Sequence, residues 1–154
     1  MQLVDILNSD RIALDVSISS KKSLLEQAAE LLSHSPEATD SRSIFDGLCQ
    51  RERLGSTGLG HGVAIPHCRV DQAGVSGALI RLRRAIDFDS PDSEPVDLFF
   101  ALAVPAQCSE THLRLLASIA EYFGDSDRRE QLRAAQQDSD LIDLMNEGST
   151  EAEQ

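Results

Sequence analysis

The chain has 154 residues, the length of one domain, with 14 basic and 26 acidic side chains and a net charge of −12. This balance argues against sequence-independent nucleic-acid binding, which needs clustered Lys and Arg, and against docking on an anionic membrane surface. No apolar run approaches the roughly 18 residues of a membrane span, and the acidic start MQLVDILNSD is unlike a signal peptide, so we expect a cytoplasmic protein without membrane insertion.

The first half of the chain predicts one strand and two helices. Apolar residues alternate with polar or small ones over residues 11–18, as in a half-buried strand. Either Ser20 or Ser23 can then cap a helix that carries leucines at helical spacing. A second helix can begin near Asp40 and end before Gly55. Its apolar stripe consists of Ile44, Phe45, Leu48 and Cys49.

The second half predicts further strands followed by helices. A glycine-rich loop leads into the short apolar run at residues 63–65. Strands follow at residues 75–82 and 95–105, and the second is nearly all apolar, as expected for a strand covered on both faces. Three helical patterns complete the chain, at residues 113–123, 126–136 and 141–145.

Strands interleaved with helices predict an α/β fold, a single domain with a central mixed β-sheet flanked by helices. We expect the domain to span residues 1–147 and the small, acidic residues 148–154 to form a disordered tail. The cysteines are odd in number and lack CxxC spacing, so we expect neither a disulfide framework nor a zinc knuckle. They are Cys49, Cys68 and Cys108.

The stretch from Arg51 to Arg69 combines residue types suited to phosphoryl chemistry. Its three alternating glycines let backbone N–H groups approach an anion. The hydroxyls of Ser56 and Thr57 can donate to phosphoryl oxygens, and a guanidinium matches the geometry of those oxygens. A neutral histidine is nucleophilic enough to attack phosphorus. Together these parts describe a phosphoryl-accepting site.

Composition alone leaves other interpretations of this stretch open. A glycine-rich turn beside a strand is often only a turn. The segment GLGHG differs from the dinucleotide fingerprint GxGxxG, and no Lys-Ser/Thr pair follows as in a Walker loop. A metal-binding or hydrolytic domain would use imidazole and thiolate ligands, which suit zinc, although the spacing matches no established zinc pattern. Its ligands would come from His61, His67, Cys68 and His112.

The motif STGLGHGVAIPH, at residues 56–67, resembles the enzyme IIA family of the bacterial phosphotransferase system, fructose/mannitol type. The upstream RERLG, the later THLRLLASIAEYF and the opening DRIALDVSISSKKSLLEQAAELL are also similar, above all to the nitrogen-regulatory, PtsN-like branch of that family. The resemblance covers about residues 1–147. Two positions depart from it: His61 stands where the branch often has a small polar residue, and Cys68 where glycine is common.

The resemblance implies a role for each candidate residue. The phosphorylated histidine of the family, directly after Ala-Ile-Pro, is His67 here, with Nε2 as the reacting atom. We expect a backbone carbonyl or a polar side chain to hold the other ring nitrogen, which fixes the tautomer. A second family histidine falls on His112, in the first turn of its helix if Ser109 is the N-cap, where it would support the phosphoryl group. Arg51 would supply charge to that group or to a partner surface.

The resemblance also implies a phosphotransferase component that is mainly regulatory rather than metabolic. Phosphate would pass from phosphoenolpyruvate through a dedicated enzyme I to an HPr-like carrier protein, and from the carrier to His67. The phosphorylation state would then alter binding to regulatory targets, such as potassium-transport or sensor-kinase components. No cofactor and no metal ion is needed, because a partner protein delivers the phosphate. The alternative is a sugar-specific IIA, of fructose or mannitol type, that passes phosphate to a IIB domain.

Overall fold

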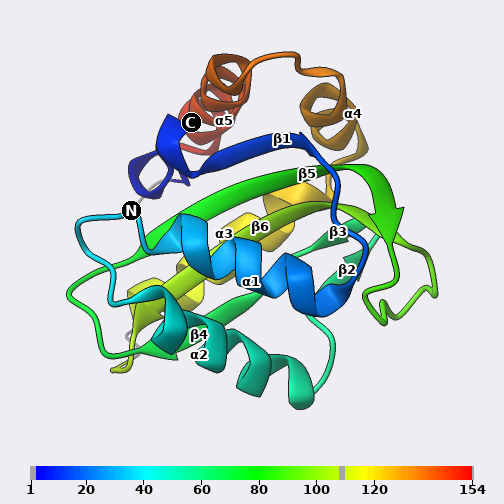
Figure 1. The fold of residues 1–154 in the computed structure, drawn as a ribbon. Coiled ribbons are helices and arrows are strands. Elements are labelled where there is room, and N and C mark those ends of the chain that lie inside the picture. Colours follow the sequence, from blue (N-terminus) through cyan, green and yellow to red (C-terminus); the bar gives the residue numbers. More distant parts are fainter. Residues whose placement is uncertain (1–2, 108–109, 154) are drawn as a thin grey trace.

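The computed structural model describes residues 3–107 and 110–153 (Figure 1), so Cys108 and the expected N-cap Ser109 lie outside the described residues. Within these ranges six strands form one sheet: β1 (Ile12–Val16), β2 (Gly58–Gly60), β3 (Val63–Ala64), β4 (His67–Val70), β5 (Ser76–Ile86) and β6 (Val96–Pro105). Their order is β1-β5-β6-β3-β2, and β4 also pairs with β6. The β5–β6 and β2–β3 pairs are antiparallel and the others are parallel, so the predicted mixed sheet is confirmed.

The helices begin at side-chain caps that the sequence indicates. Ser20, rather than Ser23, caps the first helix by accepting the N–H of Ser23, and Asp40 caps the second. Asp125 accepts two N–H groups at the start of the fourth. No helix in the described ranges is long and apolar enough to cross a membrane. The helices are α1 (Lys21–Leu32), α2 (Ser41–Arg53), α3 (Glu110–Gly124), α4 (Ser126–Ala134) and α5 (Asp138–Glu153), with 3₁₀ turns at Leu3–Ile6 and Ser9–Arg11.

Strand β6 lies at the centre of the sheet and is buried on both faces, as predicted. Its side chains alternate between two hydrophobic cores: Phe99, Ala101 and Ala103 face one, and Leu98, Phe100, Leu102 and Val104 face the other. Helices α1 and α2 cover the first face, and α3, α4 and α5 contribute to the core on the second (Figure 1). The sheet is therefore the middle layer of a three-layer domain.

The structure extends the sequence prediction in four elements. Strand β2 lies in the expected glycine-rich loop, β4 was not predicted as a strand, and β5 continues four residues past its predicted end at residue 82. Helix α5 begins before the predicted pattern at residues 141–145 and continues to Glu153. The expected disordered tail at residues 148–154 stays a prediction.

Arg81 on β5 ties the last third of the chain to the sheet. Its buried guanidinium pairs with Asp15 at 3.1 Å. It also donates to three carbonyl oxygens where α4 ends, namely those of Leu132, Arg133 and Ala135 at 2.9, 3.2 and 2.6 Å. Carbonyls at a helix C-terminus have no partner within the helix, so this side chain satisfies groups that would otherwise be left without a donor.

We therefore predict that Arg81→Met destabilises the protein by about 3 kcal/mol, because it leaves these buried carbonyls unpaired. The midpoint of urea unfolding, followed by far-ultraviolet circular dichroism, measures the change. The matched control is Arg84→Met on the exposed end of the same strand, which should stay within about 0.5 kcal/mol of wild type. Equal midpoints for the two variants would contradict the assignment.

Candidate functional site

The site begins at a break in the sheet beside β6. Strands β3 and β4 pair with the same strand, one after the other: Val63 lies opposite Leu98, and His67 opposite Leu102. Pro66, which has no N–H to donate, stands between them, and its carbonyl accepts the N–H of Leu102 at 2.9 Å. The break therefore places His67 at the start of β4, against the centre of the sheet.

The imidazole of His67 is held by the backbone that precedes it. Its Nδ1 lies 2.8 Å from the carbonyl oxygen of Ile65. A carbonyl only accepts, so Nδ1 carries the hydrogen and the lone pair is on Nε2. The expectation that a backbone carbonyl holds one ring nitrogen is confirmed. The ring is half-buried in a pocket of about 570 Å³.

Helix α2 brings Arg51 to this pocket because Gly47 lets the helix approach β4. A Cβ at Gly47 would lie 3.1 Å from the Cβ of Cys68, tighter than ordinary packing. Arg51 follows one helical turn later on the same face, and its Nη1 donates to the carbonyl of Gly55 at 2.8 Å. The pocket is lined by Gly47, Gln50, Arg51, Leu54, His67, Cys68, Arg69, Leu102, Val104 and Leu116.

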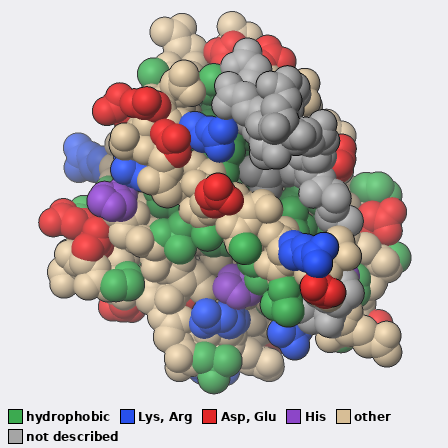
Figure 2. Space-filling view, turned by 180° about the vertical axis from the view of Figure 1, so that it is seen from behind, with side chains coloured by type: hydrophobic (Ala, Val, Ile, Leu, Met, Phe, Trp, Pro, Cys, Tyr) green, Lys and Arg blue, Asp and Glu red, His purple; other side chains and the backbone are tan. Residues whose placement is uncertain are grey.

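Cationic and apolar side chains meet at this pocket. Arg51 and Arg69 line it together with Leu54 and Leu116, and no carboxylate among the described residues lines it. Leu54 is 84% exposed, more than the other exposed large hydrophobic side chains of the described residues, Leu59 and Leu113. Figure 2 shows a face on which a histidine is bordered by Lys or Arg side chains and by hydrophobic ones. Such a rim can receive a negatively charged group from another molecule.

The pocket keeps the imidazole of His67 neutral. Burial lowers the pKa of His67 below its ordinary value, and the positive charges of Arg51 and Arg69 lower it further. The hydrogen bond to Ile65 and the carboxylate of Glu52 act in the opposite direction without reversing the shift. At pH 7 the ring is therefore an uncharged nucleophile with its lone pair on Nε2.

A buried carboxylate holds the loop that precedes the site. Glu52 accepts the hydroxyl and the N–H of Thr57 and pairs with Lys21 at 2.9 Å. The carbonyl of Thr57 in turn accepts the N–H of Ile65 at 3.0 Å. This chain of contacts links α1 and α2 to the residue that orients His67. Nothing in the sequence pattern marks Glu52, because only the fold shows that this side chain turns inward.

The two hydroxyls expected to bind a phosphoryl group have protein acceptors. Thr57 donates to Glu52, and Ser56 donates to the carbonyl of Phe88 at 2.7 Å. A direct contact of either hydroxyl with a phosphoryl group requires that these bonds change. Their role in the site stays a prediction.

The glycines of the motif build a hairpin rather than surround His67. Gly60 and Gly62 have φ values of +93° and +78°, which favour glycine, at the turn between β2 and β3. The carbonyl of Gly62 accepts the N–H groups of Asp97 and Leu98, several residues along β6 from Leu102. These conformations close the hairpin, and binding of an anion by the N–H groups of the loop stays a prediction.

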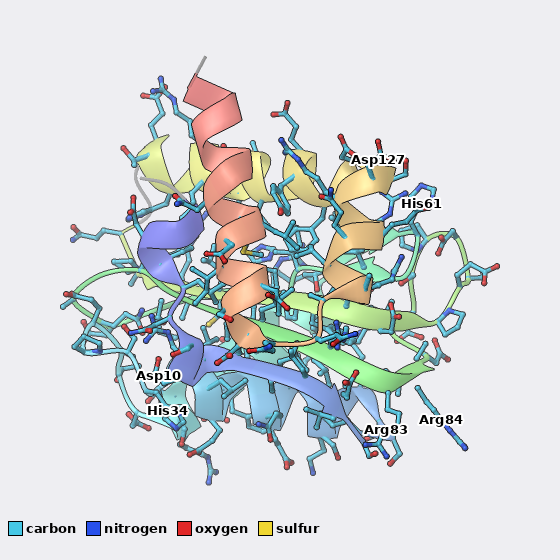
Figure 3. All side chains as sticks on the ribbon, turned by 90° about the horizontal axis from the view of Figure 1, so that it is seen from above. Asp10, His34, His61, Arg83, Arg84 and Asp127 are labelled. Atoms are coloured by element: carbon cyan, nitrogen blue, oxygen red, sulfur yellow. The ribbon has the colours of Figure 1, made fainter. Side chains whose placement is uncertain are left out.

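The remaining candidates are distributed around the sheet. His61 is exposed at the hairpin turn, on the side of α4 where Figure 3 also shows Asp127. His112 lies half-buried in the first turn of α3, and Leu116, one turn later on the same face, reaches the pocket of His67. Burial raises the pKa of Cys68 to about 12, so this thiol is protonated and unreactive.

Metal binding gains no support from the described residues. Within residues 3–107 and 110–153, no group of three or more His, Cys, Asp or Glu side chains could hold a metal ion. His61 lies in the turn between β2 and β3, whereas His67 begins β4. Arg69, by contrast, lines the pocket; in the sequence it closes the stretch from Arg51 to Arg69, two residues after His67.

Comparison with known proteins identifies relatives over nearly the whole chain. Residues 5–148 match the family model "Phosphoenolpyruvate-dependent sugar phosphotransferase system, EIIA 2". The "Nitrogen regulatory protein" of Pseudomonas aeruginosa is 44% identical over 137 residues, which is 88% of each chain. The crystal structure of nitrogen regulatory protein IIA-Ntr from Neisseria meningitidis has a TM-score of 0.87 at 39% identity, over 93% of this chain and 98% of that one.

A more distant structure shares the fold alone. The mannitol enzyme IIA of Escherichia coli, solved in complex with phosphorylated enzyme IIB, has a TM-score of 0.77 at 16% identity, over 92% of this chain and 97% of that one.

The electrostatics of the pocket make a prediction about proton binding. In an NMR titration His67 should protonate below pH 6.5, the ordinary value. Arg51→Gln removes a positive charge and should move the midpoint upward, whereas the charge-matched control Arg42→Gln should leave it unchanged. The pKa of His67 is lower in the folded protein, so the unfolded chain binds the proton more readily. The contribution of His67 to the free energy of unfolding therefore falls as the pH drops below about 6.5. A midpoint at or above 6.5 in wild type would contradict this.

The buried carboxylate makes a prediction about stability. Glu52→Ala removes the closer of the two carboxylate partners of Lys21, leaving Asp89 at 3.4 Å, and takes the side-chain acceptor from Thr57. It should destabilise the protein by about 3 kcal/mol. Urea unfolding measures the change, with exposed Glu30→Ala as the control. A loss no larger than that of the control would show that Glu52 does not organise the loop.

Proposed function

The chain belongs to the EIIA 2 family of the phosphoenolpyruvate-dependent sugar phosphotransferase system, in its nitrogen-regulatory branch, and we propose that His67 is its phosphoryl acceptor. The donor is an HPr-like carrier protein, charged from phosphoenolpyruvate by a dedicated enzyme I in the cytoplasm. The phosphorylated and unphosphorylated forms then bind regulatory target proteins differently. The carrying observation is the hydrogen bond between Nδ1 of His67 and the Ile65 carbonyl, which leaves Nε2 as the reacting atom.

The proposed step needs little beyond positioning. The Nε2 lone pair attacks phosphorus, the bond between phosphorus and the carrier breaks, and the bonding electron pair returns to the carrier. Nε2 has no hydrogen in this tautomer, so no general base is required. The ring gains positive character as the new N–P bond forms, and the bond from Nδ1–H to Ile65 becomes charge-assisted. The protein therefore stabilises the product and the transition state more than the free ring.

Charge compensation comes from the rim of the pocket. Arg51 and Arg69 both act on the charge of His67, and their guanidiniums suit the oxygens of a phosphoryl group or of the carrier's surface. We assign His112 to support of the phosphoryl group from the first turn of α3, where the helix dipole favours an anion. Ser56 and Thr57 remain candidates for phosphoryl hydrogen bonds after a rearrangement of their present contacts. No cofactor takes part.

A phosphoryl group on His67 changes what a partner protein meets. The rim exposes Leu54 beside two arginines. Phosphorylation adds about −1.5 to −2 charges in the middle of this surface. A target that binds the apolar, positively charged rim would be released, and a target with its own basic patch would be recruited. In our proposal, potassium-transport and sensor-kinase components are among the target proteins whose binding depends on the phosphorylation state.

Reconstituted phosphoryl transfer tests the proposal. With phosphoenolpyruvate, enzyme I and the HPr-like carrier, intact-mass spectrometry should detect one added phosphoryl group that acid removes. His67→Gln should abolish the addition, and the control His34→Gln, on an exposed histidine far along the chain, should leave it complete. His112→Gln should slow transfer by about 10- to 100-fold. Equal modification of wild type and His67→Gln would refute the assignment.

The sugar-specific alternative has a separate readout. Rapid loss of the phosphoryl group to a fructose- or mannitol-type IIB domain would favour onward transfer in sugar uptake. Retention of the group in the presence of that domain would favour the regulatory role.

A further inference from the structure

A hollow of about 520 Å³ lies at the other end of the sheet from His67. It is lined by Ser17, Ile18, Ser19, Arg83 and Arg84, which come from the β1–α1 connection and the end of β5. Strand β5 runs antiparallel to β6: Gly77 lies opposite Leu102, the partner of His67, whereas Ile86 lies opposite Val96. The hollow is therefore separate from the pocket of His67.

An irregularity in β5 places both arginines at this hollow. Neighbouring residues of a regular strand point to opposite faces. Between Arg81 and Ile86, however, β5 advances five positions while β6 advances only two, from Leu98 to Val96. Extra residues of this kind redirect side chains. Figure 3 shows Arg83 and Arg84 near the end of β1, at the opposite end of that strand from Asp10 and His34, and both line the hollow.

The positive charge at this hollow has no counter-charge of its own. Neither Arg83 nor Arg84 pairs with a carboxylate of the described residues, and no carboxylate lines the hollow. Asp15, at the end of β1, is bound to Arg81 instead, at 3.1 Å. Two adjacent guanidiniums without a carboxylate partner are notable in a chain with a net charge of −12, because acidic side chains outnumber basic ones.

We infer that this hollow binds the phosphate group of a small molecule. Two guanidiniums offer paired N–H donors that match phosphate oxygens, and the hydroxyls of Ser17 and Ser19 add neutral donors. Ile18 provides the apolar wall on which the carbon skeleton of a phosphate monoester rests. The site would let the protein sense a phosphorylated metabolite or free phosphate while His67 carries its own phosphoryl group at the other end of the sheet.

Size and charge favour a small ligand over a macromolecule. The excess of acidic side chains repels nucleic acids and acidic proteins, which must approach a wide area of the surface. A small dianion meets mainly the local field of Arg83 and Arg84 and fits within the volume of the hollow. An acidic polypeptide also carries carboxylates that pair with arginine, so the experiment must distinguish it from a small phosphate ligand.

The test is an NMR titration of the ¹⁵N-labelled, unphosphorylated protein at constant ionic strength. The probes are inorganic phosphate, glycerol 3-phosphate, glycerol and a short oligoglutamate. We expect saturable shifts of the amide signals of residues 17–19 and 83–84 with one or both phosphate probes, and none with glycerol. Saturation by the monoester or by inorganic phosphate alone identifies which source of the group the site takes. His67→Gln should bind equally well, so this result is independent of the proposed phosphoryl transfer.

Two charge-matched double variants decide the outcome. Arg83→Gln/Arg84→Gln should raise the dissociation constant for the phosphate probe at least about tenfold. The control Arg42→Gln/Arg114→Gln removes two exposed arginines elsewhere and should leave it within about twofold. Absence of saturable shifts, equal weakening by both double variants, or saturation by oligoglutamate alone would overturn the inference.

Discussion

The hydrogen bond from Nδ1 of His67 to the Ile65 carbonyl is the constraint on which the site depends. It exists because Pro66 separates two short strands that pair in turn with β6, so the carbonyl and the ring are fixed by the same sheet. Because the Nδ1–H of His67 already points at the Ile65 carbonyl, this hydrogen bond needs no reorganisation when phosphorus approaches Nε2. In the proposed transfer, backbone geometry thus prepares the nucleophile, and the surrounding side chains adjust its charge.

Packing behind the ring supports this geometry. Gly47 allows α2 to lie against β4, which brings Arg51 to the pocket, and Glu52 on the next position of the same helix turns inward to hold Thr57. One helix therefore supplies both the charge at the rim and the anchor of the loop. Arg83 and Arg84 form a second positive region at the far end of the sheet. Both regions stand out against an acidic chain and suit phosphate chemistry at separate places.

Much of the fold could be predicted from the sequence. The spacing of apolar residues and the capping side chains indicate the amphipathic helices, and the continuous apolar run indicates β6. Strands β2 and β4 could not, since three or four residues held by long-range pairing carry too little local pattern. His67 was identified through its motif. Glu52 was not, because inward orientation of a carboxylate depends on Lys21 meeting it from another helix. The glycines alone could not show which role they have, since a tight hairpin and an anion-binding nest require the same residue type.

The central claim is that the fold presents Nε2 of His67 as a neutral nucleophile. Long-range ¹H–¹⁵N NMR of the imidazole tests it most directly, first in the free protein and then after phosphorylation. The account predicts an Nδ1–H tautomer in the free protein and phosphorus bonded to Nε2 afterwards. A hydrogen on Nε2 in the free protein, or phosphorus on Nδ1, would contradict it.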